Sequence, residues 1–340
     1  MLDWLTPDLI LLILVVVIAL TFDFINGFHD TANAIATSVS TRALSPRTAI
    51  MLASFFNLIG ALSYTGVAKT IGGNITDPFK LDNGLVVVLA ALIAAILWNI
   101  LTWYFGIPSS SSHAIIGAVA GAAVGAAGFE SLNMAGFISI VQALIISPIA
   151  AFAVGFVVIK LVSALVANTA YHKTNRKFRM LQVLSASWQA FSHGANDAQK
   201  TMGVITLALL SGGFLHQAPG EFTIPLWVKL AAAIAMAAGT AVGGWRIIRT
   251  LGGKIMKIRP ISGFSADLSS ALVITLFTLL KLPVSTTHVI TSSILGVGAS
   301  QKFSAVKWGV AGRIVVTWFI TLPTTGLLAA ACYVVLDVFL

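Results

Sequence analysis

The 340 residues of the chain are 58% hydrophobic and only 9% charged, and their mean hydropathy is +0.96. Soluble domains carry roughly 25% charged residues, so this composition excludes a soluble globular protein and predicts an all-α polytopic membrane protein. The single cysteine, Cys332, excludes an intramolecular disulfide, and the net charge of +9 fits basic cytoplasmic loops better than a nucleic-acid partner.

Apolar stretches long enough to cross a bilayer follow one another along the chain, since a membrane-spanning helix needs about 20 such residues. We expect spans at residues 9–27, 47–66, 84–106, 109–128, 135–166, 183–211, 224–245, 263–281, 284–299 and 306–337. The stretches 135–166 and 306–337 are too long for one straight crossing and contain Pro148 and Pro323. Each is therefore kinked, strongly tilted or a pair of shorter helices, and the polar stretch 183–211 is expected to be interrupted.

Three clusters of basic residues between these spans indicate the orientation of the chain. Their members are Arg42 and Arg47; Lys173, Arg176, Lys177 and Arg179; and Arg246, Arg249, Lys254, Lys257 and Arg259. The N-terminus, the 212–223 loop and the C-terminus contain few lysines and arginines. Because basic loops stay in the cytoplasm, we expect a multi-pass protein of the cell inner (plasma) membrane with these clusters inside and both termini outside.

The two halves of the chain share motifs in the same order. Lys69–Ile75 matches Arg249–Ile255, Pro108–His113 matches Pro283–His288, and Pro148 matches Pro323. The first of these motifs lies in a loop expected outside and its copy in a loop expected inside, so the halves run in opposite directions. This predicts about 10–12 transmembrane helices in two inverted repeats, with broken helices or re-entrant hairpins that meet near the midplane. The repeats would be residues 1–167 and 183–340, joined by a basic cytoplasmic linker at 168–182.

Two acidic residues occupy matching positions in apolar sequence, Asp30 within Gly27–Ala34 and Asp197 within Ser192–Thr201. A charge at membrane depth faces a cavity or a partner, so a functional site is the default interpretation; the alternative is a structural ion pair of Asp197 with Lys200. Sodium prefers oxygen ligands, which carboxylates, amides and unwound carbonyls supply, and a proton on each aspartate would meet the same electrostatic need. The predicted cation ligands are Asp30, Asn33, Asn196 and Asp197.

A proline followed by hydroxyl residues and a histidine occurs twice, at Pro108–His113 and Pro283–His288. Proline suits the first turn of a helix, and the free N–H groups, hydroxyls and dipole of such a helix start favour an oxyanion. The alternative is that the hydroxyls only cap a helix or pack between spans. Duplication favours a site for a tetrahedral anion. The predicted phosphate ligands are Ser110, Ser111, Ser112, Asn196, Gln199, Lys200, Ser285, Thr286 and Thr287.

Other residues have accessory roles. His113 and His288 follow the hydroxyl runs and are expected to pack or to form hydrogen bonds near the site rather than to bind the ions. Asp267 begins an apolar span and is either a helix-start carboxylate or a further cation ligand. Glycines at every fourth position of Gly117–Gly125 predict close helix packing. No nucleophile and base occur at a spacing usable for catalysis, so an enzyme is not predicted and no cofactor is expected beyond coupling ions.

These motifs resemble those of the inorganic phosphate transporter (Pit) family over nearly the whole chain. Gly194–Asp197 matches the family signature, Gly27–Ala34 is similar to its divergent first copy in bacterial members, and Ser262–Asp267 and Leu282–His288 match further motifs. The resemblance implies phosphate uptake coupled to sodium or protons, inverted repeats and often a homodimer. It also implies that the aspartates and asparagines of the signature copies lie in the cation and phosphate region, with the hydroxyl runs beside phosphate.

The chain departs from the family pattern at two positions. Asn57 stands where animal members carry a functionally important glutamate, and its counterpart in the second half is Asp267. Lys200 replaces the asparagine of the animal repeat. The number and identity of the coupling cations are therefore left open by the resemblance.

The sequence predicts a secondary active transporter that imports inorganic phosphate in symport with sodium, or with protons, by alternating access at a midplane site between the repeats. The alternatives are a permease for another tetrahedral oxyanion such as sulfate, a passive anion channel, and a scaffold such as a receptor. Phosphate can donate a hydrogen bond to Asp30 or Asp197 and sulfate at neutral pH cannot, which favours phosphate. The expected partners are phosphate, sodium, membrane lipid and a second copy in a homodimer.

Overall fold

The computed structural model describes residues 6–339 except 77–80, 82, 219–220, 244–246 and 249, so Arg246 and Arg249 of the third basic cluster lie outside it. The described residues form helices and loops, with one isolated β-bridge between Thr76 and Leu132. The helices are α1 (Pro7–Ser40), α2 (Pro46–Ser63), α3 (Gly66–Asn74), α4 (Gly84–Phe105), α5 (Ser111–Ala127), α6 (Met134–Leu165), α7 (Tyr171–Ser211), α8 (Leu226–Val242), α10 (Pro260–Leu279), α11 (Thr286–Gln301) and α12 (Trp308–Leu336). Three short helices complete the set: the 3₁₀ helices η2 (Phe129–Ser131) and η4 (Phe303–Ala305) and the π-helix η3 (Thr250–Lys254).

Several of these helices are long and apolar enough to cross a membrane. Within the described residues they are α1, α4, α6, α10 and α12, and the pair α2 and α3, bent by 67°, adds another if it counts as one broken span. α5 and α8 are apolar but shorter. The prediction of an all-α polytopic membrane protein is confirmed, and the broken pair fits the prediction of broken helices.

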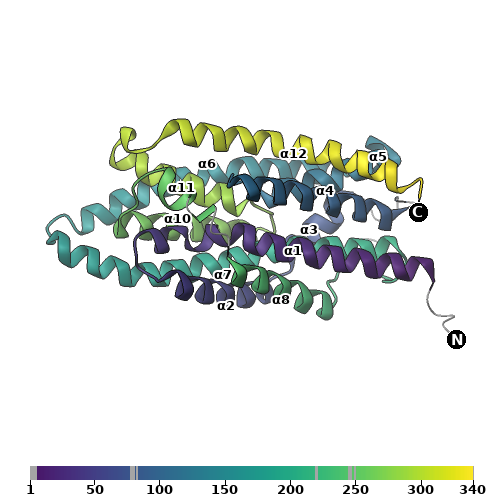
Figure 1. Cartoon of the computed structure of the whole chain (residues 1–340), viewed down its shortest axis with the longest axis horizontal. Coiled ribbons are helices and arrows are strands. Elements are labelled where there is room, and N and C mark those ends of the chain that lie inside the picture. The colour runs from purple at the N-terminus through teal and green to yellow at the C-terminus, as the bar shows by residue number, and fades with distance from the viewer. Residues whose placement is uncertain are drawn as a thin grey trace.

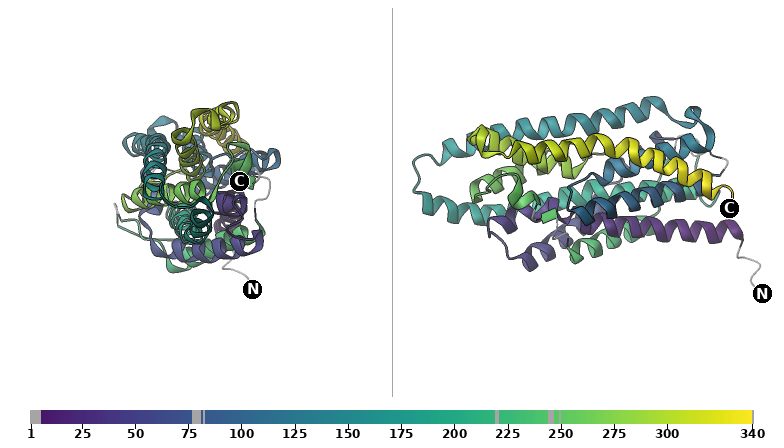
Figure 2. Two further views of the ribbon diagram at one scale, coloured as in Figure 1. Left: turned by 90° about the vertical axis from the view of Figure 1, so that its left-hand side faces the viewer. Right: turned by 45° about the horizontal axis from the view of Figure 1, so that its top comes forward.

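The long helices run side by side along an elongated bundle, seen from the side and end-on in Figures 1 and 2. The start of α1 and the end of α12 lie at one end of this bundle, and the turn between α6 and α7 lies at the other (Figure 1). The second basic cluster lies in the first turns of α7, far from the termini. Apolar side chains such as Ile149 and Phe319 are 65% and 73% exposed on the outside of α6 and α12, a surface suited to lipid.

Three stretches expected to be kinked or broken are single helices. α6 and α12 pass through Pro148 and Pro323 without ending, so neither is a pair of shorter helices. α7 runs unbroken through Ser192–Thr201, so the prediction of an interrupted 183–211 stretch is wrong, and α1 likewise continues past Asp30. A continuous helix satisfies its own backbone N–H and C=O groups, as a dry interior requires. α1 and α7 therefore supply no unwound carbonyls as cation ligands beside the two aspartates.

The segment expected as a linker is mostly helical as well. Of residues 168–182, those from Tyr171 onward form the start of α7, which continues without a break into the signature stretch. The basic residues of this segment therefore extend a helix beyond the apolar core of the bundle and do not form a separate loop.

The interruptions of helix near the site lie just before α5 and α11 and not within α1 or α7. Residues 106–110 and 280–285 form the connections, and each ends in a serine that caps the following helix. Ser110 Oγ accepts a hydrogen bond from His113 N at 3.1 Å, and Ser285 Oγ accepts one from the N–H of the matching histidine at 3.2 Å. The two helix starts predicted from the proline and hydroxyl pattern are confirmed, because each serine satisfies one of the free N–H groups there.

Glycine allows the closest helix crossings in the bundle. A Cβ atom added at Gly121 of α5 would overlap the carbonyl oxygen of Gly326 on α12, and one added at Gly117 would overlap that of Leu322. A Cβ atom at Gly194 of α7 would overlap the carbonyl oxygen of Asn57 on α2. Backbones touch at these places only because a side chain is absent, so the predicted packing role of the glycine repeat is confirmed.

Replacing Gly121 with alanine should therefore destabilise the protein, by about 1–3 kcal/mol for overpacking of this kind. Gly312→Ala on α12 is the matched control, because a Cβ atom at Gly312 meets open space. The control should leave stability unchanged or slightly raised, since alanine favours a helix. Thermal unfolding of the purified protein in detergent measures both variants, and equal melting temperatures would contradict the glycine crossing.

Candidate functional site

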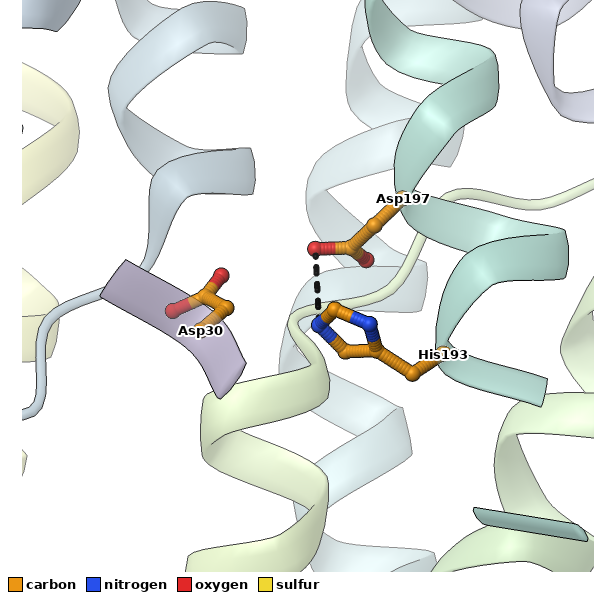
Figure 3. A group of neighbouring side chains, drawn as sticks. All are labelled: Asp30, His193 and Asp197. Carbon is orange, nitrogen blue, oxygen red and sulfur yellow. Dashed lines mark ion pairs between the residues drawn. The ribbon is translucent and has the colours of Figure 1, made fainter. Parts of the chain in front are cut away.

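Asp30 on α1 and Asp197 on α7 lie close to one another in the interior of the bundle, with the carboxylate of Asp197 directed toward Asp30 (Figure 3). Their carboxylates and the imidazole of His193 offer ligand atoms that all lie within 4.8 Å of one another. All three side chains are buried, and α1 packs against α7. The structure thus brings together the two acids that the sequence placed at matching positions of its two halves.

Asp30 is held by hydroxyl groups from both helix starts. Ser111 Oγ donates a hydrogen bond to Asp30 Oδ2 at 2.8 Å, and Thr287 Oγ1 donates one to Oδ1 at 3.2 Å. His29 Nδ1 lies 2.7 Å from Oδ1, and its Nε2 lies 3.2 Å from Thr102 Oγ1. In the part of the chain that the structure describes, no lysine or arginine forms an ion pair with Asp30, so the nearest groups that offset its charge are these hydroxyls and the imidazoles of His29 and His193.

Asp197 has a cation beside it. Lys200 Nζ lies 2.7 Å from Asp197 Oδ1, and His193 Nε2 lies 3.6 Å from Oδ2. Thr286 Oγ1 donates a hydrogen bond to Oδ2 at 3.4 Å. The ion pair with Lys200 considered as a structural alternative is therefore present. It neutralises one acid only, so the site keeps a net negative charge at Asp30 when both histidines are neutral.

The starts of α5 and α11 meet beside the aspartates. Ser112 Oγ donates to the carbonyl oxygen of Val284 at 2.7 Å, which joins one helix start to the segment before the other. Asn33 Nδ2 donates to Thr287 Oγ1 at 2.9 Å and to Thr286 Oγ1 at 3.3 Å, while its Oδ1 has no partner among the described residues. Hydroxyls, helix N-termini and carboxylates thus border one region, a combination that suits an anion and a hard cation together.

His113 and His288 lie behind these helix starts. They line an apolar cavity of about 560 Å³ between α5, α6, α11 and α12. The ring of His288 stacks on that of Trp318 with centroids 3.9 Å apart, and His113 Nδ1 lies 2.8 Å from Ser110 Oγ. Packing and hydrogen bonding, the roles expected for the two histidines, describe these contacts.

Asn196 and Gln199, both predicted as phosphate ligands, form hydrogen bonds to neighbouring segments in this structure. Asn196 donates to Thr278 Oγ1 at 2.9 Å and accepts from the N–H of Val284 at 3.2 Å. Gln199 Oε1 accepts from Val67 N at 2.8 Å, at the start of α3. Helical geometry explains these contacts. Asp197 and His193, four residues apart, share one face of α7, whereas Asn196 and Gln199, three residues apart, share an adjacent face that contacts other segments.

The two accessory positions differ in their distance from the pair. Asp267 accepts a hydrogen bond from Thr37 Oγ1 at 2.6 Å. Thr37 follows Asp30 on α1 by about two helical turns, so Asp267 lies away from the aspartate pair. It lies inside α10 rather than at its start, which excludes a helix-start carboxylate. Asn57 Oδ1 lies 3.1 Å from His193 Nδ1, so Asn57 orients the imidazole that reaches the second aspartate.

Sequence reasoning missed the two histidines of the site. His29 is the immediate neighbour of Asp30, and His193 stands four residues before Asp197. Residues four apart share a helix face, so His193 would have been found if Ser192–Thr201 had been taken as a continuous helix. The imidazoles add hydrogen-bonding and proton-accepting groups to what was expected to be an oxygen-only site.

The chain is similar to known transporters along its whole length. The model of the Phosphate transporter family matches residues 26–329. A Bacillus subtilis (strain 168) protein named "Probable low-affinity inorganic phosphate transporter" is 58% identical over 329 residues, which cover 97% of this chain and 98% of that protein. A Rhizobium meliloti (strain 1021) protein of the same name is 46% identical over 331 residues, 96% of this chain and 97% of that one.

A solved structure has the same architecture. It is named "The sodium-dependent phosphate transporter", and it matches this chain with a TM-score of 0.91 at 26% sequence identity, over 97% of this chain and 100% of that one. These relatives are transporters and not enzymes, as the sequence predicted.

The buried ion pair makes a thermodynamic prediction. Removing one partner leaves the other charge buried, at a cost of about 3–5 kcal/mol, so Asp197→Asn and Lys200→Met should each lower the melting temperature of the purified protein. The double variant should be more stable than either single variant, because it removes both charges together. Simple addition of the two single effects would show that Asp197 and Lys200 are not coupled.

Proposed function

This chain belongs to the phosphate transporter family, and we propose on that premise that it imports inorganic phosphate across the cell membrane in symport with sodium. The observation that carries the proposal is the buried Asp30–Asp197 pair between the hydroxyl-bearing starts of α5 and α11. Protons are the alternative coupling ion, and the experiment below separates the two.

Cations are required by the charge of the site. Asp30 has no basic partner among the described residues except an imidazole, and a phosphate dianion beside it would raise the negative charge further. A cation bound between Asp30, Asn33 and Asp197 removes this repulsion, and Asn33 has an unpartnered amide oxygen to offer it. Binding of phosphate and of the cation then support one another, which is the thermodynamic basis of symport.

Phosphate suits the helix starts better than other oxyanions do. Ser111, Ser112, Thr286 and Thr287 place hydroxyls at two helix N-termini, with Lys200 nearby on α7. A partly protonated phosphate can also donate a hydrogen bond to an aspartate, whereas sulfate presents only acceptors to the two carboxylates. Sulfate is therefore the weaker candidate.

We further propose that residues 1–167 and 183–340 are inverted repeats that alternate around this site. The packing of the helices is reciprocal, which supports the proposal: α5 packs on α12 while α11 packs on α6, and α2 packs on α7 while α8 packs on α1. Each contact between the halves is thus matched by a second contact between the two corresponding helices. Rocking of such interlocked halves exposes a site between them to one side of the membrane at a time.

The orientation, the lipid contacts and the assembly are part of the same proposal. The cluster around Lys177 lies at the end of the bundle away from the ends of α1 and α12, so we place that end in the cytoplasm and both termini outside the inner membrane. Lipid surrounds the apolar outer faces of α6 and α12. The homodimer implied by the family resemblance is retained, and no nucleic-acid partner is proposed.

Phosphate uptake into proteoliposomes tests the transport reaction. With an inward sodium gradient and equal pH on both sides, radiolabelled phosphate should accumulate above its external concentration, and sulfate should not compete. Accumulation driven by an inward proton gradient alone would assign coupling to protons. Uptake that never exceeds equilibrium under any gradient would identify a channel, and preferential accumulation of sulfate would identify a different oxyanion permease.

The same assay tests the aspartate. Asp197→Asn should abolish uptake while the protein is still produced, and the double variant with Lys200→Met should remain inactive although its stability recovers. Asp8→Asn is the matched control, because Asp8 is an exposed acid in the first turn of α1. Uptake at the wild-type rate in the stable double variant would refute a cation-binding role for Asp197, whereas no uptake by the wild-type protein itself would favour a passive scaffold.

Cysteine labelling tests the orientation. In a Cys332→Ser background, Lys177→Cys should react with an impermeant maleimide only after the cells are made permeable, whereas His216→Cys should react in intact cells. Both residues are exposed, so access depends on the side of the membrane rather than on burial. The reverse pattern would invert the proposed topology.

A further inference from the structure

The polar face of α1 extends beyond the aspartate pair. Asp23, Asn26, Asp30, Asn33 and Thr37 recur at intervals of three or four residues, so they share one face of the helix, and all are buried. The last three have hydrogen-bond partners. In the described part of the chain, neither carboxylate oxygen of Asp23 and neither amide atom of Asn26 has one.

Thr201 of α7 completes this group, which we call the Asp23 cluster: Asp23, Asn26 and Thr201. Thr201 Oγ1 is also buried and lacks a hydrogen-bond partner among the described residues. The side chains of Thr201 and Asn26 are polar neighbours close enough to interact with the Asp23 carboxyl group, although neither meets the geometry of an ordinary hydrogen bond with it. The carboxylate of Asp23, the amide of Asn26 and the hydroxyl of Thr201 are therefore buried next to one another between α1 and α7.

Asp23 lacks the positive partner that a buried carboxylate needs. The buried ammonium that acts on it is that of Lys200, but Lys200 Nζ lies 2.7 Å from Asp197 and forms its ion pair there. Asp197 itself adds negative charge to the surroundings of Asp23. No ion pair with Asp23 is found among the described residues, so Asp23 holds either a proton or a bound cation.

The ligand atoms favour sodium over other cations. Oxygen ligands without thiolate or imidazole suit hard cations and disfavour transition metals. One carboxylate balances a single positive charge, whereas calcium sites generally combine several charged ligands and magnesium keeps most of its water. The Asp30–Asp197 pair differs, because His29 and His193 border it.

The Asp23 cluster is not a product of the internal duplication. The offset that relates Asp30 to Asp197 pairs Asp23 with Ala190 and Thr201 with Ala34, neither of which has a polar side chain. Asn26, the third member, pairs with His193, so the cluster has no complete counterpart elsewhere in the chain. It is distinct from the duplicated site that the motifs define.

We propose that Asp23, Asn26 and Thr201 bind a sodium ion separate from any cation at the Asp30–Asp197 pair. Asp23 precedes Asp30 by about two helical turns on the side where α1 begins. In the proposed orientation this sodium ion sits on the extracytoplasmic side of the pair, at the point where coupling ions approach it. Its part in coupling rests on the proposed function, but the binding of sodium itself does not.

Equilibrium binding of radioactive sodium to the purified full-length protein in detergent tests the site without transport. Asp23→Asn should bind one sodium ion fewer per protein than the wild type. Thr201→Val, which removes one ligand oxygen and keeps the charge, should weaken that ion's binding by about tenfold or more. Asp8→Asn, an exposed acid on the same helix, should bind as the wild type does.

The outcomes separate the possibilities. Unchanged sodium binding in a monodisperse Asp23→Asn variant overturns the proposal, and so does a variant that binds sodium normally but takes up one proton fewer on acidification, because Asp23 then carries a proton. If Asp23→Asn does not fold, Thr201→Val decides alone, and full sodium affinity in it refutes the site. Wild-type protein that binds this ion but moves no phosphate refutes the proposed function and leaves the site standing.

Discussion

The structure depends on how negative charge is balanced in a region that excludes water. The ligand atoms of Asp30 and Asp197 lie within 4.8 Å of each other, and two like charges at that distance repel by about 3 kcal/mol or more at an effective dielectric constant of about 20. Lys200 offsets one of them. The remaining charge makes a cation a condition for anion binding, because an oxyanion alone would add to the repulsion that already exists.

The acidic side chains of the site come from the middle of continuous helices, and the hydroxyl groups that face them come from helix starts. α1 and α7 carry the acids on unbroken helices, whose backbones need nothing from outside. α5 and α11 begin inside the protein, where Ser110 and Ser285 satisfy only part of the exposed N–H groups. The hydroxyls of Ser111, Thr286 and Thr287, in the first turns of these helices, donate hydrogen bonds to the two acids. Anion-binding and cation-binding groups therefore meet where helix starts face helix middles.

Local patterns predicted the helices and the two helix starts, because hydropathy and capping are properties of neighbouring residues. They also identified Asp30 and Asp197, since an acid in apolar sequence stands out by itself. They could not give the direction of a side chain that depends on whether its helix is continuous: Asn196 and Gln199 form hydrogen bonds to other segments, and His193, which reaches Asp197, was not predicted. Asp23 belongs to no repeated motif, so only its burial without a partner reveals it.

The two halves of the site are similar in sequence but unequal in charge. Lys200 occupies the position that Asn33 has in the first half, so α7 carries its own cation while α1 carries only amides and acids. An ammonium fixed to α7 cannot leave with the substrate, and it reduces by one the positive charge that mobile ions must bring. The demand for mobile cations therefore falls on α1, where Asp30 lacks a basic partner and Asn33 keeps a free amide oxygen. In the proposed symport, the carboxylate of Asp23, two turns earlier on that same face, increases this demand on one side of the pair and so gives the entry and the release of ions different electrostatic surroundings.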